Sequence, residues 1–101
     1  MSSSMIEVQV ADAVDVHVGV DRLVVELEDG RAISLPLSWY PRLLHGKPDE
    51  RNNYRLIGGG SGIHWPDLDE DLSVEDLLAG HRSQESQKSL QRWLDERNRN
   101  K

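Results

Sequence analysis

The sequence predicts an α+β fold: a small antiparallel β-meander with short helices and a C-terminal helical tail. Three observations support this prediction, namely valines that alternate with polar residues near the amino end, an Asp-Gly pair between two alternating segments, and a polar, helix-permissive segment after residue 83. The length of 101 residues suits one domain with a modest core. We therefore expect a compact domain over residues 1–80 and a polar amphipathic tail over residues 81–101.

Three segments carry the period-two pattern of half-buried strands. Valines alternate with polar residues over residues 14–20, and apolar residues recur at every second position over residues 23–28. Asp29-Gly30 favours a tight hairpin turn, because glycine accepts the positive φ that such a turn requires. Residues 31–35 then return as a third strand, which predicts an antiparallel meander.

Proline, glycine and capping residues divide the middle of the chain. Pro36 ends the third strand, because it cannot donate a ladder hydrogen bond. Ser38 is expected to cap a short helix that continues through Leu44 and ends at Gly46. Residues 49–53 are all polar, and we expect them to form a turn or a further short helix. The core face of the first helix is expected to consist of Trp39, Tyr40 and Leu43.

Residues 54–57 resemble a strand and lead into a glycine-rich run at 58–62. We interpret these glycines as a hinge, a bulge or a close backbone approach. Ser73, with Asp76 three residues later, resembles a capping box. A short helix is expected to follow it and to end at Gly80.

The segment after the glycine run combines an imidazole, an indole and several carboxylates. Three alternate aspartates imitate a calcium-binding EF-hand loop, but Leu72 and Leu78 occupy the positions that require glycine and glutamate. His64 could act as a general base with Asp67 or Asp69 as its orienting carboxylate. This hypothesis is disfavoured, because no nucleophile in a recognisable context accompanies the pair. We expect no catalytic residue, no metal site and no cofactor. The signature residues, whose role stays open, are His64, Trp65, Asp67, Asp69 and Asp71.

The tryptophans predict two kinds of contact. Trp65 is expected to anchor the acidic loop to the sheet, with its indole buried and its N–H bonded to a carbonyl. Trp93 shares an otherwise polar helix with Leu90 and Leu94, at spacings of three and four. It either docks on the domain or enters a groove of a partner, and both alternatives stay open. In the second case the contact residues would be Leu90, Arg92, Trp93, Leu94 and Arg97.

Charge and composition narrow the class of protein. Residues 1–80 carry 15 acidic and 6 basic side chains, a net charge of −9, whereas residues 81–101 carry 3 and 6, a net charge of +3. An acidic body favours basic partners and repels phosphate backbones. No cysteine is present, which excludes disulfides and thiolate chemistry. Neither a signal peptide nor a membrane-spanning stretch is visible, so we expect a cytoplasmic protein without membrane association.

Four motifs follow one another in the chain, at residues 27–31 (LEDGR), 36–43 (PLSWYPRL), 62–72 (GIHWPDLDEDL) and 77–80 (LLAG). In this order they resemble the uncharacterised bacterial family catalogued as domain of unknown function 2442, over roughly residues 12–80. The resemblance implies a small α+β domain with a three-stranded meander, short helices and further strand pairing. It also implies a two-gene pair with another small protein, in which this family would act as an antitoxin. Some members carry a DNA-binding helix-turn-helix after this unit, for which too few residues follow here.

We therefore predict a non-catalytic protein-binding module, an antitoxin-like or regulatory partner of another small bacterial protein encoded by a neighbouring gene. Formation of a homo-oligomer stays open. The alternative is a DNA- or RNA-binding transcriptional regulator. A less favoured hypothesis is a small enzyme or metal-binding protein centred on the His64 loop. In the regulator, the phosphate contacts would come from Lys88, Arg92, Arg97, Arg99 and Lys101.

Overall fold

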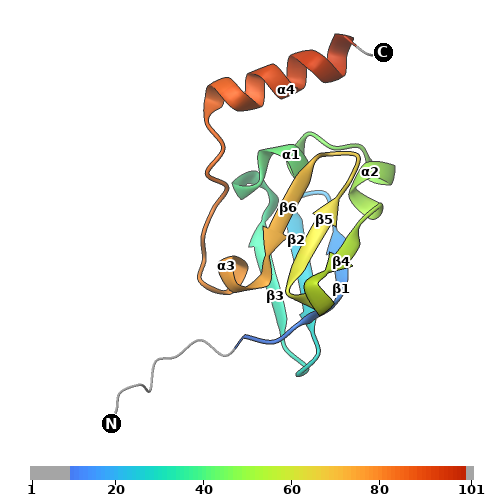
Figure 1. Cartoon of the computed structure of the whole chain (residues 1–101), viewed down its shortest axis with the longest axis vertical. Coiled ribbons are helices and arrows are strands. Elements are labelled where there is room, and N and C mark those ends of the chain that lie inside the picture. Colours follow the sequence, from blue (N-terminus) through green and yellow to red (C-terminus); the bar gives the residue numbers. More distant parts are fainter. Residues whose placement is uncertain (1–9, 100–101) are drawn as a thin grey trace.

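The computed structural model describes residues 10–99 and folds them into two antiparallel three-stranded sheets with mostly short helices (Figure 1). The first sheet, in the order β1-β2-β3, consists of β1 (Ala13–Val18), β2 (Arg22–Leu27) and β3 (Ala32–Pro36). The second sheet, in the order β4-β5-β6, consists of β4 (Arg55–Ile57), β5 (Gly62–Trp65) and β6 (Glu70–Ser73). The helices are η2 (Leu37–Trp39), α1 (Pro41–Leu44), α2 (Pro48–Asn52), η3 (Gly58–Gly60), α3 (Val74–Leu78) and α4 (Gln87–Arg99). This architecture confirms the predicted α+β class.

The first sheet is the predicted meander. The N–H of Leu27 donates to the carbonyl of Arg31 at 2.8 Å across the Asp-Gly turn, where Gly30 has a φ of 96°. The prediction was wrong at both ends of the first strand. β1 ends at Val18 and leaves Val20 88% exposed, and the register shifts between Ala13 and Asp15. Ala13 is buried in place of Val14, which is 54% exposed. A β-bulge inserts one residue and so reverses the faces on which the preceding side chains lie.

The sequence predicted that Ser38 caps the helix after the first sheet, and this prediction was wrong. Residues 37–39 form a 3₁₀ turn, and α1 begins only at Pro41, with no side-chain cap. Proline disfavours helical backbone angles in the residue before it, and Tyr40 accordingly has a φ of −129° and a ψ of 82°. The kink turns the Tyr40 side chain into the core, where it is 1% exposed beside the fully buried Leu43.

Other predicted boundaries hold. The Oγ of Ser73 accepts the N–H of Asp76 at 3.1 Å and caps α3, and Gly80 follows that helix with a φ of 79°. The residues 48–52 form α2. In the glycine run, Gly60 provides the close backbone approach that was one of three interpretations. A Cβ at Gly60 would lie 2.7 Å from the carbonyl oxygen of Ala13.

The second sheet is only partly the structure that was expected. The strand at 54–57 was predicted, but the acidic segment after the glycines was expected to be a loop. It is instead a hairpin in which β5 and β6 pair, with Ile63 opposite Leu72. Aspartate and glutamate are depleted in strands, which is why the pattern of β6 is not recognisable locally.

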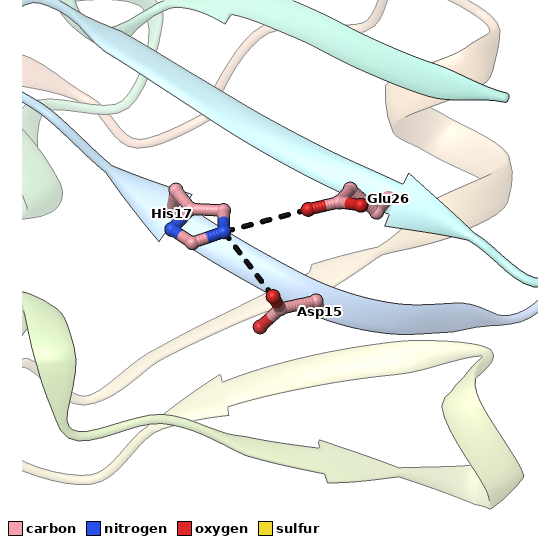
Figure 2. A group of neighbouring side chains, drawn as sticks. All are labelled: Asp15, His17 and Glu26. Atoms are coloured by element: carbon pink, nitrogen blue, oxygen red, sulfur yellow. Dashed lines mark ion pairs between the residues drawn. The ribbon is translucent and has the colours of Figure 1, made fainter.

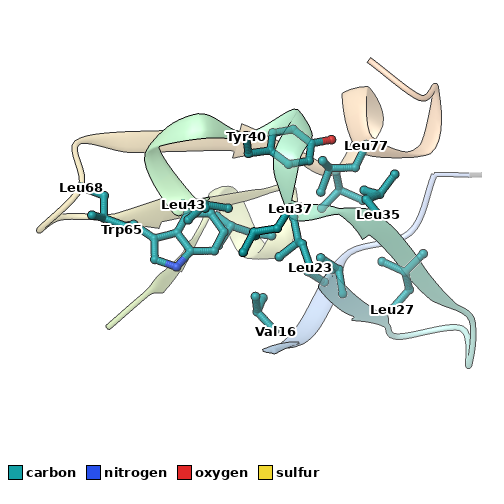
Figure 3. Close-up of a cluster of buried hydrophobic side chains, with 14 residues drawn as sticks. Val16, Leu23, Leu27, Leu35, Leu37, Tyr40, Leu43, Trp65, Leu68 and Leu77 are labelled. Carbon is teal, nitrogen blue, oxygen red and sulfur yellow. The ribbon is translucent and has the colours of Figure 1, made fainter. Parts of the chain in front are cut away.

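One buried cluster joins the two sheets and the short helices (Figure 3). The first sheet contributes Leu23 and Val25, the second contributes Ile63 and Trp65, and α1 contributes Leu43, all with 0% exposure. Burial of these side chains supplies most of the stabilisation of a domain of this size. The core therefore lies between the sheets and leaves the outer face of the first sheet to solvent.

Residues 81–99 lie against the domain (Figure 1). The hydroxyl of Tyr40 donates to the carbonyl of His81 at 3.1 Å, and the N–H of Ser83 donates to the carbonyl of Trp39 at 3.1 Å. The extended segment of residues 81–86 therefore runs beside the body before α4 begins. Within the described part of the chain, no helix has the length and apolar character needed to cross a membrane.

Candidate functional site

Trp65 anchors the hairpin as the sequence predicted. Its side chain is fully buried, and its Nε1–H donates to the carbonyl of Arg51 at 3.0 Å. The ring of Tyr54 lies 6.4 Å from it, centroid to centroid. Trp65 is thus part of the core and positions the polar residues on either side of it.

His64 pairs with a carboxylate other than Asp67 and Asp69, the two considered in the disfavoured general-base hypothesis. Residue 64 stands opposite residue 71 in the β5–β6 register, and Nδ1 of His64 lies 2.5 Å from Oδ1 of Asp71. The expected partners are engaged elsewhere, because Asp67 accepts a hydrogen bond from Asn53 at 2.8 Å and Asp69 lies near Arg42. The pairing with Asp71 follows from the hairpin register, which the expectation of a loop did not include.

The loop aspartates do not converge on a common point. Asp67 and Asp69 flank Leu68, which is fully buried, so that the loop is fixed by an apolar contact. Asp69 has a φ of 50°, and its carbonyl accepts from Nη1 of Arg42 at 3.1 Å. Within residues 10–99, the side chains that have metal-ligand spacing lie on the first sheet instead.

A cleft of about 490 Å³ opens between β6 and the segment of residues 81–89. No pattern in the sequence indicates that the hairpin and the tail are neighbours, but both line this cleft. The walls carry more negative than positive charge. The acidic residues that line the cleft are Asp69, Glu70, Asp71, Asp76 and Glu85, and the basic ones are Arg42, His81 and Arg82.

The two arginines of the cleft already have partners. Arg42 donates from Nε and Nη2 to the carboxylate of Glu85, with the shorter contact at 2.5 Å. Arg82 stacks on the ring of Trp39, with its Cζ 4.5 Å from the ring centroid. Arg42 also reaches Asp69, with Nη1 3.5 Å from Oδ2, so its charge is shared between two of the five carboxylates that line the cleft. Acidic side chains therefore outnumber basic ones, and the cleft keeps a negative field.

Glu70 is the carboxyl most altered by this environment. Burial raises its pKa from the ordinary value of 4.5 to about 7, and this effect outweighs the opposing hydrogen bond from the N–H of Asp71 and the charge of Arg42. The nearby carboxylates of Glu85 and Asp71 raise the pKa further. Glu70 therefore gains or loses a proton near neutral pH, and a cation that entered the cleft would favour the ionised form.

The tail helix docks on the domain, which is one of the two alternatives left open for Trp93. The Trp93 ring lies between two guanidinium groups, with the Cζ of Arg42 at 5.0 Å and that of Arg97 at 4.7 Å from its centroid. Arg97 also pairs with Glu50 of α2 at 2.8 Å. Leu90 and Leu94 are half-buried, whereas Arg92 is exposed.

Sequence reasoning missed the residues on the body that receive the tail. These residues are Arg42, which contacts Glu85 and Trp93, and Glu50, which pairs with Arg97. Arg42 stands in one of the family motifs and Glu50 in a polar segment, but no local pattern indicates a contact with the tail. Their roles arise from contacts between segments far apart in the chain. Of the basic residues proposed for nucleic-acid contact, Arg97 is paired with Glu50, Lys88, Arg92 and Arg99 are exposed, and Lys101 lies outside the described residues.

The fold and the cleft describe a small α+β domain with an acidic cleft closed on one side by its own C-terminal segment. The chain belongs to the family described as protein of unknown function (DUF2442), whose model matches residues 13–83. This match confirms the family resemblance seen in the sequence motifs.

Two solved structures resemble the chain. A crystal structure of a protein of unknown function from Rhodospirillum rubrum ATCC 11170 has a TM-score of 0.65 and 26% sequence identity, over 81% of this chain and 99% of that chain. A solution NMR structure of an uncharacterized protein from Chromobacterium violaceum has a TM-score of 0.62 and 20% identity, over 80% of this chain and 74% of that chain. The second likeness concerns the fold alone. No protein with a curated description matches the chain.

Proposed function

We propose that the chain is a non-catalytic protein-binding module that uses the acidic cleft to bind a basic segment of another small bacterial protein. The observation that carries this proposal is the excess of carboxylates in a cleft whose two arginines are already engaged. Such a field attracts lysine and arginine side chains and orients a basic partner before contact.

The shape of the cleft supports an extended peptide as the bound element. β6 is an edge strand, because the order of the second sheet is β4-β5-β6. On this strand the N–H of Asp71 donates to the side chain of Glu70 at 3.2 Å. An incoming strand could pair with this free edge while its basic side chains met the carboxylates, as in β-strand addition.

The hydrogen bonding of the histidines supports a role without catalysis. His64 contacts Asp71, and His81 contacts Asp76 at 3.3 Å. Throughout residues 10–99, no serine hydroxyl is hydrogen-bonded to a histidine. A histidine with an orienting carboxylate but no neighbouring side-chain nucleophile lacks one half of the pair used in nucleophilic catalysis.

The partner is proposed to be a small protein, with the chain acting as its antitoxin-like or regulatory counterpart. The acidic body and the family resemblance, with its two-gene arrangement, support this role. Trp93 packs on the body, so α4 would act chiefly by fixing the 81–86 segment as the second wall of the cleft. Leu90 and Leu94 would be available at the edge of the helix for additional contacts.

The experiment is an affinity purification of the tagged full-length chain from its own cells, with and without nuclease, followed by binding measurements on the purified partner. Wild type is compared with Asp69→Asn/Asp71→Asn, whose carboxylates line the cleft, and with Glu75→Gln, an exposed residue of α3 outside it.

We expect one stoichiometric protein that survives nuclease. Its affinity should fall by roughly tenfold or more in the double variant, as for loss of charge pairs in an interface, and should stay unchanged in Glu75→Gln. Retention of nucleic acid, with partners lost on nuclease treatment, would support the regulator hypothesis instead. Equal binding by the double variant and wild type would show that the cleft is not the binding surface.

A further inference from the structure

The outer face of the first sheet carries a second group of titratable side chains, away from the acidic cleft (Figure 2). Asp15 and His17 lie two residues apart on β1 and so share one face of the strand, and Glu26 stands opposite Asp15 on β2. Each residue offers one ligand atom, an imidazole nitrogen from His17 and one oxygen from each of the two carboxylates, and these three atoms lie within 4.8 Å of one another. These residues belong to the alternating pattern that predicts the strands, and the sequence analysis assigned them no role.

We propose that Asp15, His17 and Glu26 form a binding site for a divalent transition-metal ion such as Zn²⁺ or Mn²⁺. The Nε2 atom of His17 lies 3.2 Å from Oδ2 of Asp15 and 3.4 Å from Oε2 of Glu26. Ligands held at about 2.1 Å from a tetrahedral ion lie about 3.4 Å apart. Both nitrogen–oxygen distances are therefore close to those of a coordination shell, and the two carboxylate oxygens lie within 4.8 Å of each other, so that only a small movement of the side chains is needed.

Without a cation, the hydrogen-bonding capacity and the negative charge of the two carboxylates are only partly compensated. Nε2 of His17 carries at most one proton and can donate it fully to only one of two nearby carboxylates. Among residues 10–99, no lysine or arginine pairs with Asp15 or Glu26. A divalent ion in place of that proton would bind the nitrogen and both carboxylates at once, and would neutralise two negative charges.

Asp15 is held in place by a second layer of hydrogen bonds. Its Oδ1 accepts from the hydroxyl of Tyr54 at 2.9 Å and from the N–H of Val16 at 2.9 Å, which leaves Oδ2 directed at His17. The bond from Tyr54 is the main cause that lowers the pKa of Asp15 and keeps it ionised. Metal-binding carboxylates are commonly oriented by outer hydrogen bonds of this kind.

The donor set indicates which ions fit. One imidazole and two carboxylates suit Zn²⁺, Mn²⁺, Co²⁺ or Ni²⁺, whereas Ca²⁺ and Mg²⁺ prefer an all-oxygen shell. The three side chains are about half exposed, so water would complete the coordination. Because the ligands come from paired strands rather than from a loop, little ordering is required for binding.

The test is a calorimetric titration of the full chain, with its purification tag removed, with Zn²⁺ and separately with Mg²⁺. The variants are His17→Gln and Glu26→Gln, both at exposed positions, and circular dichroism verifies that each is folded. His81→Gln is the matched control, because His81 is equally exposed but contacts a single carboxylate, that of Asp76.

We expect one Zn²⁺ per chain, no heat with Mg²⁺, and an affinity at least tenfold weaker in His17→Gln than in wild type or His81→Gln. Tyr54→Phe, which keeps all three ligands, should weaken binding by a factor of roughly ten, as for loss of an outer-layer partner. Absence of Zn²⁺ binding by the wild type would overturn the proposal. So would Zn²⁺ binding that His17→Gln leaves intact.

Discussion

The guanidinium of Arg42 donates two hydrogen bonds to the carboxylate of Glu85, 43 residues later in the chain, and one oxygen of Glu85 lies 2.5 Å from Nη2. Both side chains are largely shielded from water, at 15% and 12% exposure. The same guanidinium stacks on the ring of Trp93, with its Cζ 5.0 Å from the ring centroid. Arg42 therefore joins the short helix α1 to both the linker and the tail helix.

The first prediction concerns the strength of this pair. In a double-mutant cycle of Arg42→Ala and Glu85→Ala, the coupling in the free energy of unfolding should be about 1–3 kcal/mol, because charged hydrogen bonds shielded from water exceed exposed pairs. The matched control is the exposed pair of Asp29 and Arg31, 41% accessible on each side, which should give less than about 1 kcal/mol. Urea denaturation measures both cycles. Equal coupling in the two would mean that the shielding has no energetic effect.

The second prediction concerns Trp93. Trp93→Ala should lower the free energy of unfolding by about 1–2 kcal/mol, because two cation–π contacts of about 0.5–1 kcal/mol each are lost with part of the apolar burial. The exposed Arg92 on the same helix is the control, and Arg92→Ala should change stability by less than about 0.5 kcal/mol. Hydrogen exchange of the α4 amides should accelerate in Trp93→Ala. Unchanged exchange would show that α4 does not depend on this contact.

The third prediction is that acid weakens the docking of the tail. Hydrogen bonds from Arg42 and Arg97 lower the pKa values of Glu85 and Glu50, respectively. A carboxyl with a folded pKa below its unfolded pKa of about 4.3 contributes stability above that pH, and the contribution is lost as the pH falls through the folded pKa. The stability difference between wild type and Glu50→Gln/Glu85→Gln should therefore shrink between about pH 5 and pH 3. A difference that stays constant over this range would contradict the prediction.

The elements that follow local rules could be predicted from the sequence. The meander rests on alternation and on the Asp-Gly turn, and α3 rests on the cap at Ser73 and the stop at Gly80. Even the hydrogen bond from the Trp65 indole to a backbone carbonyl was predictable, because a buried indole requires an acceptor.

The remaining features depend on contacts between distant segments. The bulge at Val14 interrupts a strand whose alternating pattern looks continuous in the sequence. The kink before Pro41 likewise changes the backbone angles of a single residue, Tyr40. The acidic cleft requires β6 to be a strand, and β6 contains two carboxylates in four residues. Tertiary pairing with β5 overrides its poor strand propensity, and no local signal records that pairing.

The fourth prediction tests the close approach of the glycine run to the first sheet. Gly60 has a φ of 105°, and an added Cβ would lie 2.7 Å from the carbonyl oxygen of Ala13 and 2.8 Å from Cβ of Asp12. Gly59 also has a positive φ, of 70°, but a Cβ there would meet nothing within 4 Å. Gly59→Ala should thus cost only the backbone strain of about 1–2 kcal/mol, whereas Gly60→Ala should cost at least about 1 kcal/mol more. Similar midpoints in urea for the two variants would refute the close approach.

The fifth prediction uses Glu70 to test the character of the cleft. Its folded pKa of about 7 lies above the ordinary 4.5, so the folded state holds the proton more tightly. The free energy of unfolding must therefore fall as the pH rises from about 4.5 to 7. Glu70→Gln removes this dependence and should be more stable than wild type at pH 8 but not at pH 4.5. At about 1.4 kcal/mol per pKa unit the gain is at most about 3.5 kcal/mol, and water in the open cleft reduces it to about 1–2 kcal/mol.

Urea denaturation of wild type and Glu70→Gln at several pH values measures this difference directly. Glu75→Gln, at an exposed position of the neighbouring helix, is the control and should give a difference that does not change with pH. A pH-independent difference for Glu70→Gln would mean that the pKa of Glu70 is the same in the folded and unfolded states, as in an open, solvated groove. A basic peptide bound in the cleft should also lower the pKa of Glu70, because a nearby cation favours the carboxylate. Since Glu70 is about half protonated at pH 7, binding should release up to about half a proton per chain. Binding heats measured in buffers of different ionisation enthalpy would then differ for wild type and coincide for Glu70→Gln.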